Sequence, residues 1–310
     1  MILRLSLFLL AFLLASGGGL LLWCCGRRGV PDYWDASVIL SHGQGARRDD
    51  VLAGKAWLET QHLEQVETAA DDELKLRGTF LRKKKGALGT VLLFHDSRSS
   101  WRLDFSGIAQ FLFEEGYQLL LVDQRAHGRS GGFWITYGIW ERFDVRAWTN
   151  YLAMRFGDDH SIWIYGFGMG GTAALMSASL ELSGVVRGII SEDAFSDPFD
   201  QLRRRAAAVF SPLPVAPALW LLHFFASVFV GFGLRDYTAA TALSESSYPV
   251  MMIHGTENRR VPVTVAMSMQ KRCREGMGGL LLVDGADYGQ CRCTDPEGVK
   301  AALQRFFRDV

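Results

Sequence analysis

The chain carries no net charge, because 33 lysine and arginine residues balance 33 aspartate and glutamate residues. A strong basic excess is what draws a protein to nucleic acid, so we expect no nucleic-acid partner. Cysteine is scarce, with five residues whose spacing matches neither a disulfide framework nor a zinc site, so we expect no metal and no cofactor. A disulfide from Cys273 to Cys291 or Cys293 and unpaired thiols at these positions are equally compatible with the sequence. Histidine is absent after His254.

One stretch lacks charge altogether, from Leu5 to Cys25, and arginines flank it on both sides. Twenty-one helical residues at 1.5 Å each are long enough for the ~30 Å hydrocarbon core of a bilayer. A cleaved signal peptide is the alternative, with Ala15–Gly17 as its cleavage site. The apolar run resumes at Leu20–Trp23, beyond that site, which favours an uncleaved anchor.

We therefore predict three parts: a membrane anchor over residues 1–28, a juxtamembrane linker over 29–54 and a globular domain over 55–310. Hydrophobic residues make up 49% of the chain and charged residues 21%, as expected for one large domain with an ample core. The protein would then be held at the membrane by a single pass. The flanking arginines leave its orientation open. We place the domain on the extracytoplasmic side as a working prediction.

Within the domain, short apolar runs alternate with amphipathic stretches of helical spacing. Such alternation predicts an α/β fold with a mostly parallel sheet and helices on both faces. The predicted strands are Gln65–Ala69, Leu74–Leu81, Thr90–Phe94, Tyr117–Val122, Ser161–Tyr165, Val185–Ile190, Val250–Ile253 and Leu280–Val283.

A segment over 196–236 interrupts this alternation. Its core, Ala218–Leu234, has one histidine and no formal charge. A second membrane span is one interpretation. The segment lies between two sheet strands, however, so a span would force one sheet to straddle a bilayer. We predict a short apolar cap over the active end of the sheet.

The sequence Ile162–Gly171 enters a glycine-rich turn from an apolar strand and leaves it in a helix of small residues. This is the layout of a nucleophile elbow, Gly-x-Ser-x-Gly, which holds a serine on a sharp turn. Gly166, Gly170 and Gly171 are in place as the elbow scaffold. The serine position is Gly168, which has no atom that can attack a carbonyl.

Four motifs in this order resemble the α/β-hydrolase fold, and within it the bacterial, membrane-anchored, serine aminopeptidase (S33)-like hydrolases. The resemblance extends from Trp57 to Phe307. The motifs are Leu93-Phe-His-Asp-Ser97, Val122-Asp-Gln-Arg-Ala-His-Gly-Arg-Ser130, Tyr165-Gly-Phe-Gly-Met-Gly-Gly171 and Pro249-Val-Met-Met-Ile-His-Gly-Thr-Glu-Asn-Arg-Arg-Val-Pro262.

The resemblance implies a Ser–His–Asp triad, and this chain departs from it at all three positions. The nucleophile falls on Gly168, the acid on Asn258 and the base on Tyr288. No histidine follows His254, so a shift of register cannot restore the base. The oxyanion-hole donors fall on the backbone N–H groups of Ser97 and Met169.

The residue before Ser97, usually glycine in this family, is Asp96. A carboxylate turned inward there would repel the charge that develops on a reacting oxygen.

A rebuilt site has candidates, but no serine among them lies at the elbow. They are Ser97, Ser99 and Ser191 as hydroxyls, His95 and His127 as imidazoles, and Glu192 and Asp193 as acids. The histidines lie in motif positions, where we expect them to be hydrogen-bonded structural residues.

We predict a catalytically inactive α/β-hydrolase-fold protein at the membrane, a pseudoenzyme. It would bind an apolar, acyl or lipid ligand in the old cleft, or a protein partner. The alternative is an ester, peptide or amide hydrolase with a non-standard or residual site. A scaffold without any ligand also stays open.

Overall fold

The computed structural model describes residues 2–27, 29, 45–83, 85–210 and 214–310, and for residues 2–12 and 46 it describes the backbone only. Most of the predicted linker, residues 30–44, lies outside the described residues. So do residues 211–213 of the predicted cap.

The domain is built on an eight-stranded sheet with the order β1-β2-β4-β3-β5-β6-β7-β8. β2 runs antiparallel to both β1 and β4, and the other neighbours are parallel. The mostly parallel sheet expected from the sequence is confirmed. The strands are β1 Leu63–Ala69, β2 Lys75–Leu81, β3 Thr90–Phe94, β4 Gln118–Asp123, β5 Ser161–Phe167, β6 Val185–Glu192, β7 Val250–Gly255 and β8 Gly278–Val283.

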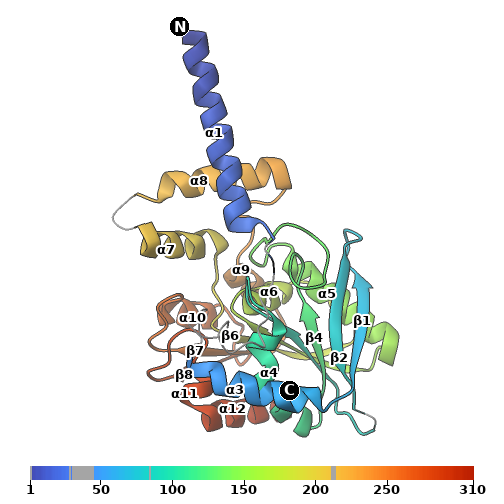
Figure 1. Ribbon diagram of the computed structural model, residues 1–310. Helices are drawn as coiled ribbons and strands as arrows, with labels where there is room; N and C mark the ends of the chain where they lie inside the picture. The colour runs from blue at the N-terminus through green and yellow to red at the C-terminus, as the bar shows by residue number, and fades with distance from the viewer. Residues whose placement is uncertain (1, 28, 30–44, 84, 211–213) are drawn as a thin grey trace.

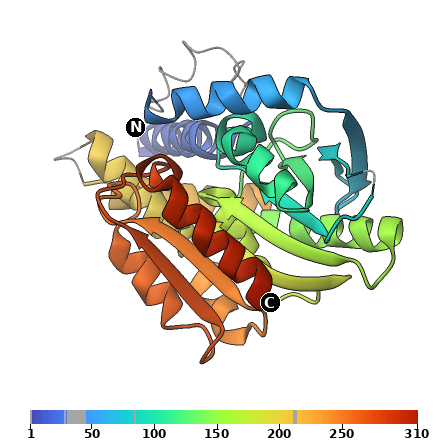
Figure 2. The same ribbon diagram turned by 90° about the horizontal axis from the view of Figure 1, so that it is seen from below.

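The central strands are apolar because helices cover both faces. Every residue of β3 and β4 is buried, as expected for strands that face a helical layer on each side. Figures 1 and 2 show the two layers. One holds α3 Arg48–Glu59, α4 Trp101–Glu114 and α12 Pro296–Asp309, with the short α11 Cys291–Thr294 beside it. The other holds α5 Glu141–Phe156, α6 Met169–Ser177, α9 Ala239–Glu245 and α10 Val263–Gln270.

The predicted linker is too long at its C-terminal end. A short 3-10 turn, η1 Gly45–Arg47, and then α3 already belong to the domain. The Arg47 side chain is 2% exposed and donates to the carbonyls of Leu103 and Asp104. A Cβ at Gly54 would lie 2.1 Å from the Ser106 carbonyl oxygen, so α3 and α4 are in close backbone contact. The sequence pattern misses this because the helix begins with charged residues, Arg48 to Asp50.

The predicted anchor forms helix α1, Ile2–Cys25, which projects from the domain (Figure 1). Within the part of the chain that the structure describes, we find no helix whose length and hydropathy would let it cross a membrane. The end of α1 is embedded in the domain. The Cys24 carbonyl accepts the Tyr137 hydroxyl at 2.7 Å, and the Cys25 carbonyl accepts the Ile135 N–H at 2.7 Å.

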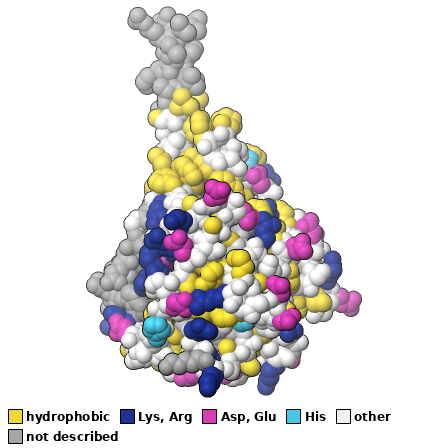
Figure 3. All heavy atoms as spheres, turned by 90° about the vertical axis from the view of Figure 1, so that its right-hand side faces the viewer, with side chains coloured by type: hydrophobic (Ala, Val, Ile, Leu, Met, Phe, Trp, Pro, Cys, Tyr) yellow, Lys and Arg dark blue, Asp and Glu magenta, His cyan; other side chains and the backbone are white. Residues whose placement is uncertain are grey.

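The predicted cap is formed by two short helices and a π-helical turn: α7 Pro198–Phe210, α8 Ala216–Phe225 and η2 Ala226–Val230. α8 crosses α1 (Figure 1), and a Cβ at Gly17 would lie 2.3 Å from the Phe225 ring. Hydrophobic side chains gather around the base of α1 and over these helices, whereas the domain below carries mixed charges (Figure 3).

Candidate functional site

The turn between β5 and α6 keeps the backbone of a nucleophile elbow. Gly168 has φ 55° and ψ −117° and stands at the N-terminus of α6. This conformation costs a residue with a side chain about 1–3 kcal/mol, and glycine adopts it freely. A Cβ at Gly166 would lie 2.2 Å from the Gly170 carbonyl oxygen, and one at Gly170 would lie 2.0 Å from that of Phe94. The close approach of strand and helix therefore requires glycine at these positions.

The two N–H groups predicted to form an oxyanion hole already bind a side chain of the protein itself. Asp96 follows β3 and turns inward, and its Oδ1 accepts the Ser97 N–H at 2.7 Å and the Met169 N–H at 2.8 Å. These are the two donors expected to hold a reacting oxygen. A carboxyl oxygen thus takes the place where a substrate oxyanion would bind.

Tyr288, at the position of the catalytic histidine, holds that carboxyl group in place. Its hydroxyl donates to Asp96 Oδ2 at 2.7 Å. Burial first, and then the neighbouring Asp96, raise the pKa of Tyr288 well above its ordinary value, so the hydroxyl keeps its proton and donates. Both side chains are less than 10% exposed.

Together Asp96 and Tyr288 leave no room for a nucleophile. A Cβ at Gly168 would lie 2.1 Å from the Tyr288 hydroxyl oxygen and 2.4 Å from Asp96 Oδ1. Both distances are far inside van der Waals contact. The absence of a side chain at Gly168 is therefore sterically linked to the residues at 96 and 288.

Asn258, at the position of the catalytic acid, serves the loop that contains it. Its amide oxygen accepts the N–H groups of Arg260 and Val261, and its amide nitrogen donates to Asp193 Oδ1 at 2.9 Å. Asp193 also accepts the Gly289 N–H at 2.6 Å, next to Tyr288. The amide and the buried carboxyl group thus tie the turn after β7 to the loop after β8.

Asp193 should make the stability of the protein depend on pH. Burial first, and then Glu192, raise its pKa from 3.8 to about 7. Between pH 3.8 and pH 7 the folded protein keeps a proton on Asp193 that the unfolded chain has released. The contribution of Asp193 to the free energy of unfolding therefore falls as the pH rises from about 4 to about 7. Relative to an Asp193→Asn variant, the wild type should lose up to about 4 kcal/mol of stability over this window. Thermal unfolding of both proteins at pH 5 and pH 8 measures this, and a constant difference would contradict it.

A buried ionic cluster lies beside the elbow, below the sheet's carboxyl edge. Arg292 pairs with Glu192 at 2.9 Å, and the Tyr165 hydroxyl donates to the same carboxylate at 2.8 Å. Glu192, Asp193 and Cys291 have potential metal-ligand atoms within 4.8 Å of one another. Their oxygens are already engaged by these partners, and burial raises the pKa of the Cys291 thiol. Neither the composition of the cluster nor its contacts favour a metal ion. None of the five cysteines forms a disulfide bond in the structure.

The candidates for a rebuilt site do not pair as a nucleophile and its base, although the rings of His95 and His127 lie edge to face with centroids 5.0 Å apart. His95 and His127 use both ring nitrogens on backbone groups of the loops that hold them. Burial first, and then His95, lower the pKa of His127 to about 3, so this ring is neutral. Ser191 is 1% exposed within β6. None of these groups forms a hydroxyl–imidazole pair among the described residues.

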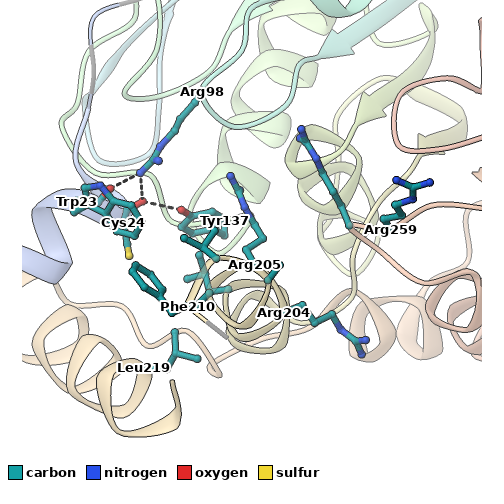
Figure 4. A pocket seen from close by; sticks show the side chains of 14 residues that line it. Trp23, Cys24, Arg98, Tyr137, Arg204, Arg205, Phe210, Leu219 and Arg259 are labelled. Carbon is teal, nitrogen blue, oxygen red and sulfur yellow. Dashed lines mark hydrogen bonds between the residues drawn. The ribbon is translucent and has the colours of Figure 1, made fainter. Parts of the chain in front are cut away.

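A cavity of about 410 Å³ lies next to the elbow, between the body and the cap. Six segments contribute to its walls: the end of α1, the loop after β3, the loop before α5, α7, α8 and the turn after β7 (Figure 4). Its walls carry arginines and apolar side chains. The sequence motifs did not indicate these arginines as site residues, although Arg204–Arg205 in the cap and Arg259–Arg260 beside Asn258 stand in pairs.

Residues 91–308 match the model of a family described as the alpha/beta hydrolase family. The match covers more than half of the chain, and the sheet and elbow have the geometry described above. The chain belongs to the alpha/beta hydrolase family.

A curated relative from Bacillus subtilis (strain 168), the uncharacterized protein YqkD, is 25% identical over 195 residues. The match covers 63% of this chain and 63% of YqkD, which is less than two thirds of either protein.

Among solved structures, the Pyrococcus furiosus esterase Pf2001 has a TM-score of 0.69 and 21% identity, over 92% of this chain and 97% of that one. A membrane phospholipase A, described as a bacterial virulence factor, has a TM-score of 0.55 and 17% identity, over 99% and 98% of the two chains. At these identities the likeness establishes the fold.

Proposed function

We propose that this protein is a pseudoenzyme of the alpha/beta hydrolase family. It uses the hydrolase scaffold to bind an apolar or acyl ligand, or a protein partner, without turning it over. The observation that carries this is the carboxyl group of Asp96 in the oxyanion hole, held there by Tyr288 over Gly168. Stabilisation of the developing oxyanion is often the largest catalytic contribution of such sites, and here its two donors are already taken.

The cavity beside the elbow supports ligand binding over a purely structural role. Its volume of about 410 Å³ lies within the range of small-molecule sites. Because the elbow itself is closed, the ligand site that remains is this neighbouring cavity between body and cap. A protein partner at the same face is the second form of this proposal.

The alternative function, hydrolysis by a non-standard or residual site, is favoured by the esterase and phospholipase among the structural neighbours. The narrower kinship with serine aminopeptidase-like hydrolases also remains a proposal, resting on the motifs alone. The chemistry of the site argues against turnover, since the nucleophile, base and charged acid are all replaced.

An assay of the full-length protein on p-nitrophenyl esters of short and medium acyl chains tests the proposal. We expect no turnover above that of heat-denatured protein and no labelling by a fluorophosphonate probe. Variants Ser97→Ala, Ser99→Ala and Ser191→Ala serve as controls. Turnover that one of them abolishes would identify a nucleophile and overturn the proposal.

Mass spectrometry of organic extracts of the purified protein separates the two binding roles. A bound amphiphile in amounts comparable to the protein supports the ligand role, and its absence favours the protein partner.

We further propose that α1 attaches the protein to a membrane as a single pass, with the domain on the extracytoplasmic side. Support comes from the uncharged stretch Leu5–Cys25 of this helix. It comes also from the exposed apolar side chains on its described turns and on α8, including Leu13, Leu14, Trp220 and Phe224. The contacts of its last turn with the domain favour an uncleaved segment. Release of the full-length protein from membranes by alkaline carbonate would contradict attachment. Protease resistance of the domain in spheroplasts would contradict the orientation.

A further inference from the structure

The cavity between body and cap has two kinds of wall. Five arginines line it, Arg98, Arg204, Arg205, Arg259 and Arg260, and none of its lining residues is acidic. The rest of the lining is largely apolar and belongs to the end of α1, to α7 and to α8, with Tyr137 from the loop before α5. A cavity of this composition suits neither a neutral apolar ligand alone nor a bare anion.

Three of the five guanidinium groups already contact other polar groups of the protein. Arg204 pairs with Asp200 at 2.7 Å on α7, and Arg259 lies 3.8 Å from Asp287. Arg98 donates to the carbonyls of the last turn of α1 (Figure 4).

Arg205 and Arg260 differ from these. Within the described ranges of the chain, neither has an ion pair with a carboxylate. Arg260 lies over the Tyr288 ring, 4.7 Å from its centroid, and so stands directly above the closed elbow. Arg205 extends from α7 and lines the same cavity as Arg260 (Figure 4). Two cations, one from α7 and one from the turn after β7, therefore line one cavity that has no carboxylate in its lining.

The apolar wall lies on the side of α1 and the cap. The rings of Trp23 and Phe210 meet edge-on with centroids 6.4 Å apart, and Leu202 and Leu219 close the wall from α7 and α8. Val209 and Phe210 remain 69% and 45% exposed. This wall continues into the hydrophobic surface around the base of α1 (Figure 3).

We propose that the cavity binds an anionic amphiphile, a single acyl chain that carries a phosphate or carboxylate head. The head lies between Arg205 and Arg260, whose planar guanidinium groups match such oxyanions in two-pronged hydrogen bonds. The chain lies along Phe210 and Leu219 toward α1. This inference rests on the proposed ligand-binding function and adds the chemistry of the head group.

Titrations of the full-length protein in a neutral detergent, followed by native mass spectrometry, test the assignment. The probes are palmitoyl lysophosphatidate, monopalmitoyl glycerol with the same chain but no charge, and inorganic phosphate. The test variant is Arg205→Gln with Arg260→Gln. The matched control is Arg203→Gln, on the same helix but outside the cavity lining.

The wild type should bind lysophosphatidate about 10- to 100-fold more tightly than the neutral lipid. The double variant should lose this preference while its affinity for the neutral lipid stays the same, and Arg203→Gln should behave as the wild type. Both substituted arginines are exposed, so the double variant should fold, and its melting temperature verifies this.

Three results would overturn the assignment, each in a different way. Equal affinity of the wild type for the charged and neutral lipids would contradict recognition of an anionic head group but would leave the proposed binding of an acyl ligand in place. Inorganic phosphate bound as tightly as lysophosphatidate would reduce the cavity to a bare anion site. Binding of none of the probes would remove the proposed ligand-binding function as well.

Discussion

Gly168→Ser, which restores the serine of the family motif, is expected to destabilise the protein by about 4 kcal/mol and to yield no hydrolase. The new side chain would begin 2.1 Å from the Tyr288 hydroxyl oxygen and 2.4 Å from Asp96 Oδ1, so both groups must move. It would also take the positive φ of 55° that glycine tolerates. Gly276→Ser is the matched control, because Gly276 has φ 77° with no neighbouring atom within 4 Å. It should cost only about 1 kcal/mol, the backbone strain alone.

Activity should be highest when the three linked positions change together. In Asp96→Gly/Gly168→Ser/Tyr288→His the oxyanion donors are free, the hydroxyl has room and an imidazole replaces the phenol. We expect hydrolysis of short p-nitrophenyl esters about 10³-fold above the uncatalysed rate, since an open oxyanion hole alone supplies enhancement of this order in a disabled serine protease. Variants that keep Asp96 should stay inactive, because its carboxyl group still takes both oxyanion donors. Asp96→Gly/Gly168→Ser, which keeps Tyr288, should stay below the triple variant, because it has no imidazole and its serine meets the phenol.

Adding Asn258→Asp to the triple variant should not raise the rate. The Asn258 amide nitrogen donates to Asp193 Oδ1 at 2.9 Å, so a second buried carboxyl group would face the first. Ester hydrolysis and thermal unfolding of all variants measure these effects. An active Gly168→Ser single variant of wild-type stability would show that Asp96 and Tyr288 do not close the site.

The fold was predictable from the sequence because its signals are local and repeated. Apolar runs such as Thr90–Phe94 become strands buried on both faces, and their alternation with helices defines a parallel sheet. The elbow was predictable for a similar reason, since Gly166 and Gly170 lie where only glycine fits. The start of the domain was not, because α3 begins with charged residues that are held by contacts with distant α4.

The closed site was only partly predictable. The departures from the family motifs at 168, 258 and 288 were visible in the sequence. The Asp96 carboxylate was also predicted to repel negative charge in the oxyanion hole if it turned inward. What the sequence could not show is that Tyr288, 192 residues away, holds the Asp96 carboxyl group inward. The arginine-lined cavity was also missed, because its walls come from six separate segments that only the folded chain brings together.

Asp96→Ala is expected to destabilise the protein by about 3 kcal/mol. The substitution leaves the Ser97 and Met169 N–H groups and the Tyr288 hydroxyl without their acceptor. Buried donors that lose a partner cost about 1–3 kcal/mol each, less where water enters. Asp96→Asn keeps one oxygen for the two N–H groups and should cost only about 1 kcal/mol. Thermal unfolding of the full-length variants measures both.

Formate should distinguish loss of this acceptor from a general packing defect. A small carboxylate can enter the space left by Asp96→Ala and accept the same three donors, so it should raise the melting temperature of this variant and leave the wild type and Asp96→Asn unchanged. In a Tyr288→Phe background the destabilisation caused by Asp96→Ala should be smaller by about 1–2 kcal/mol, because one of the three hydrogen bonds to Asp96 is already absent. Additive effects and no response to formate would mean that the carboxyl group does not serve as the internal occupant of the oxyanion hole.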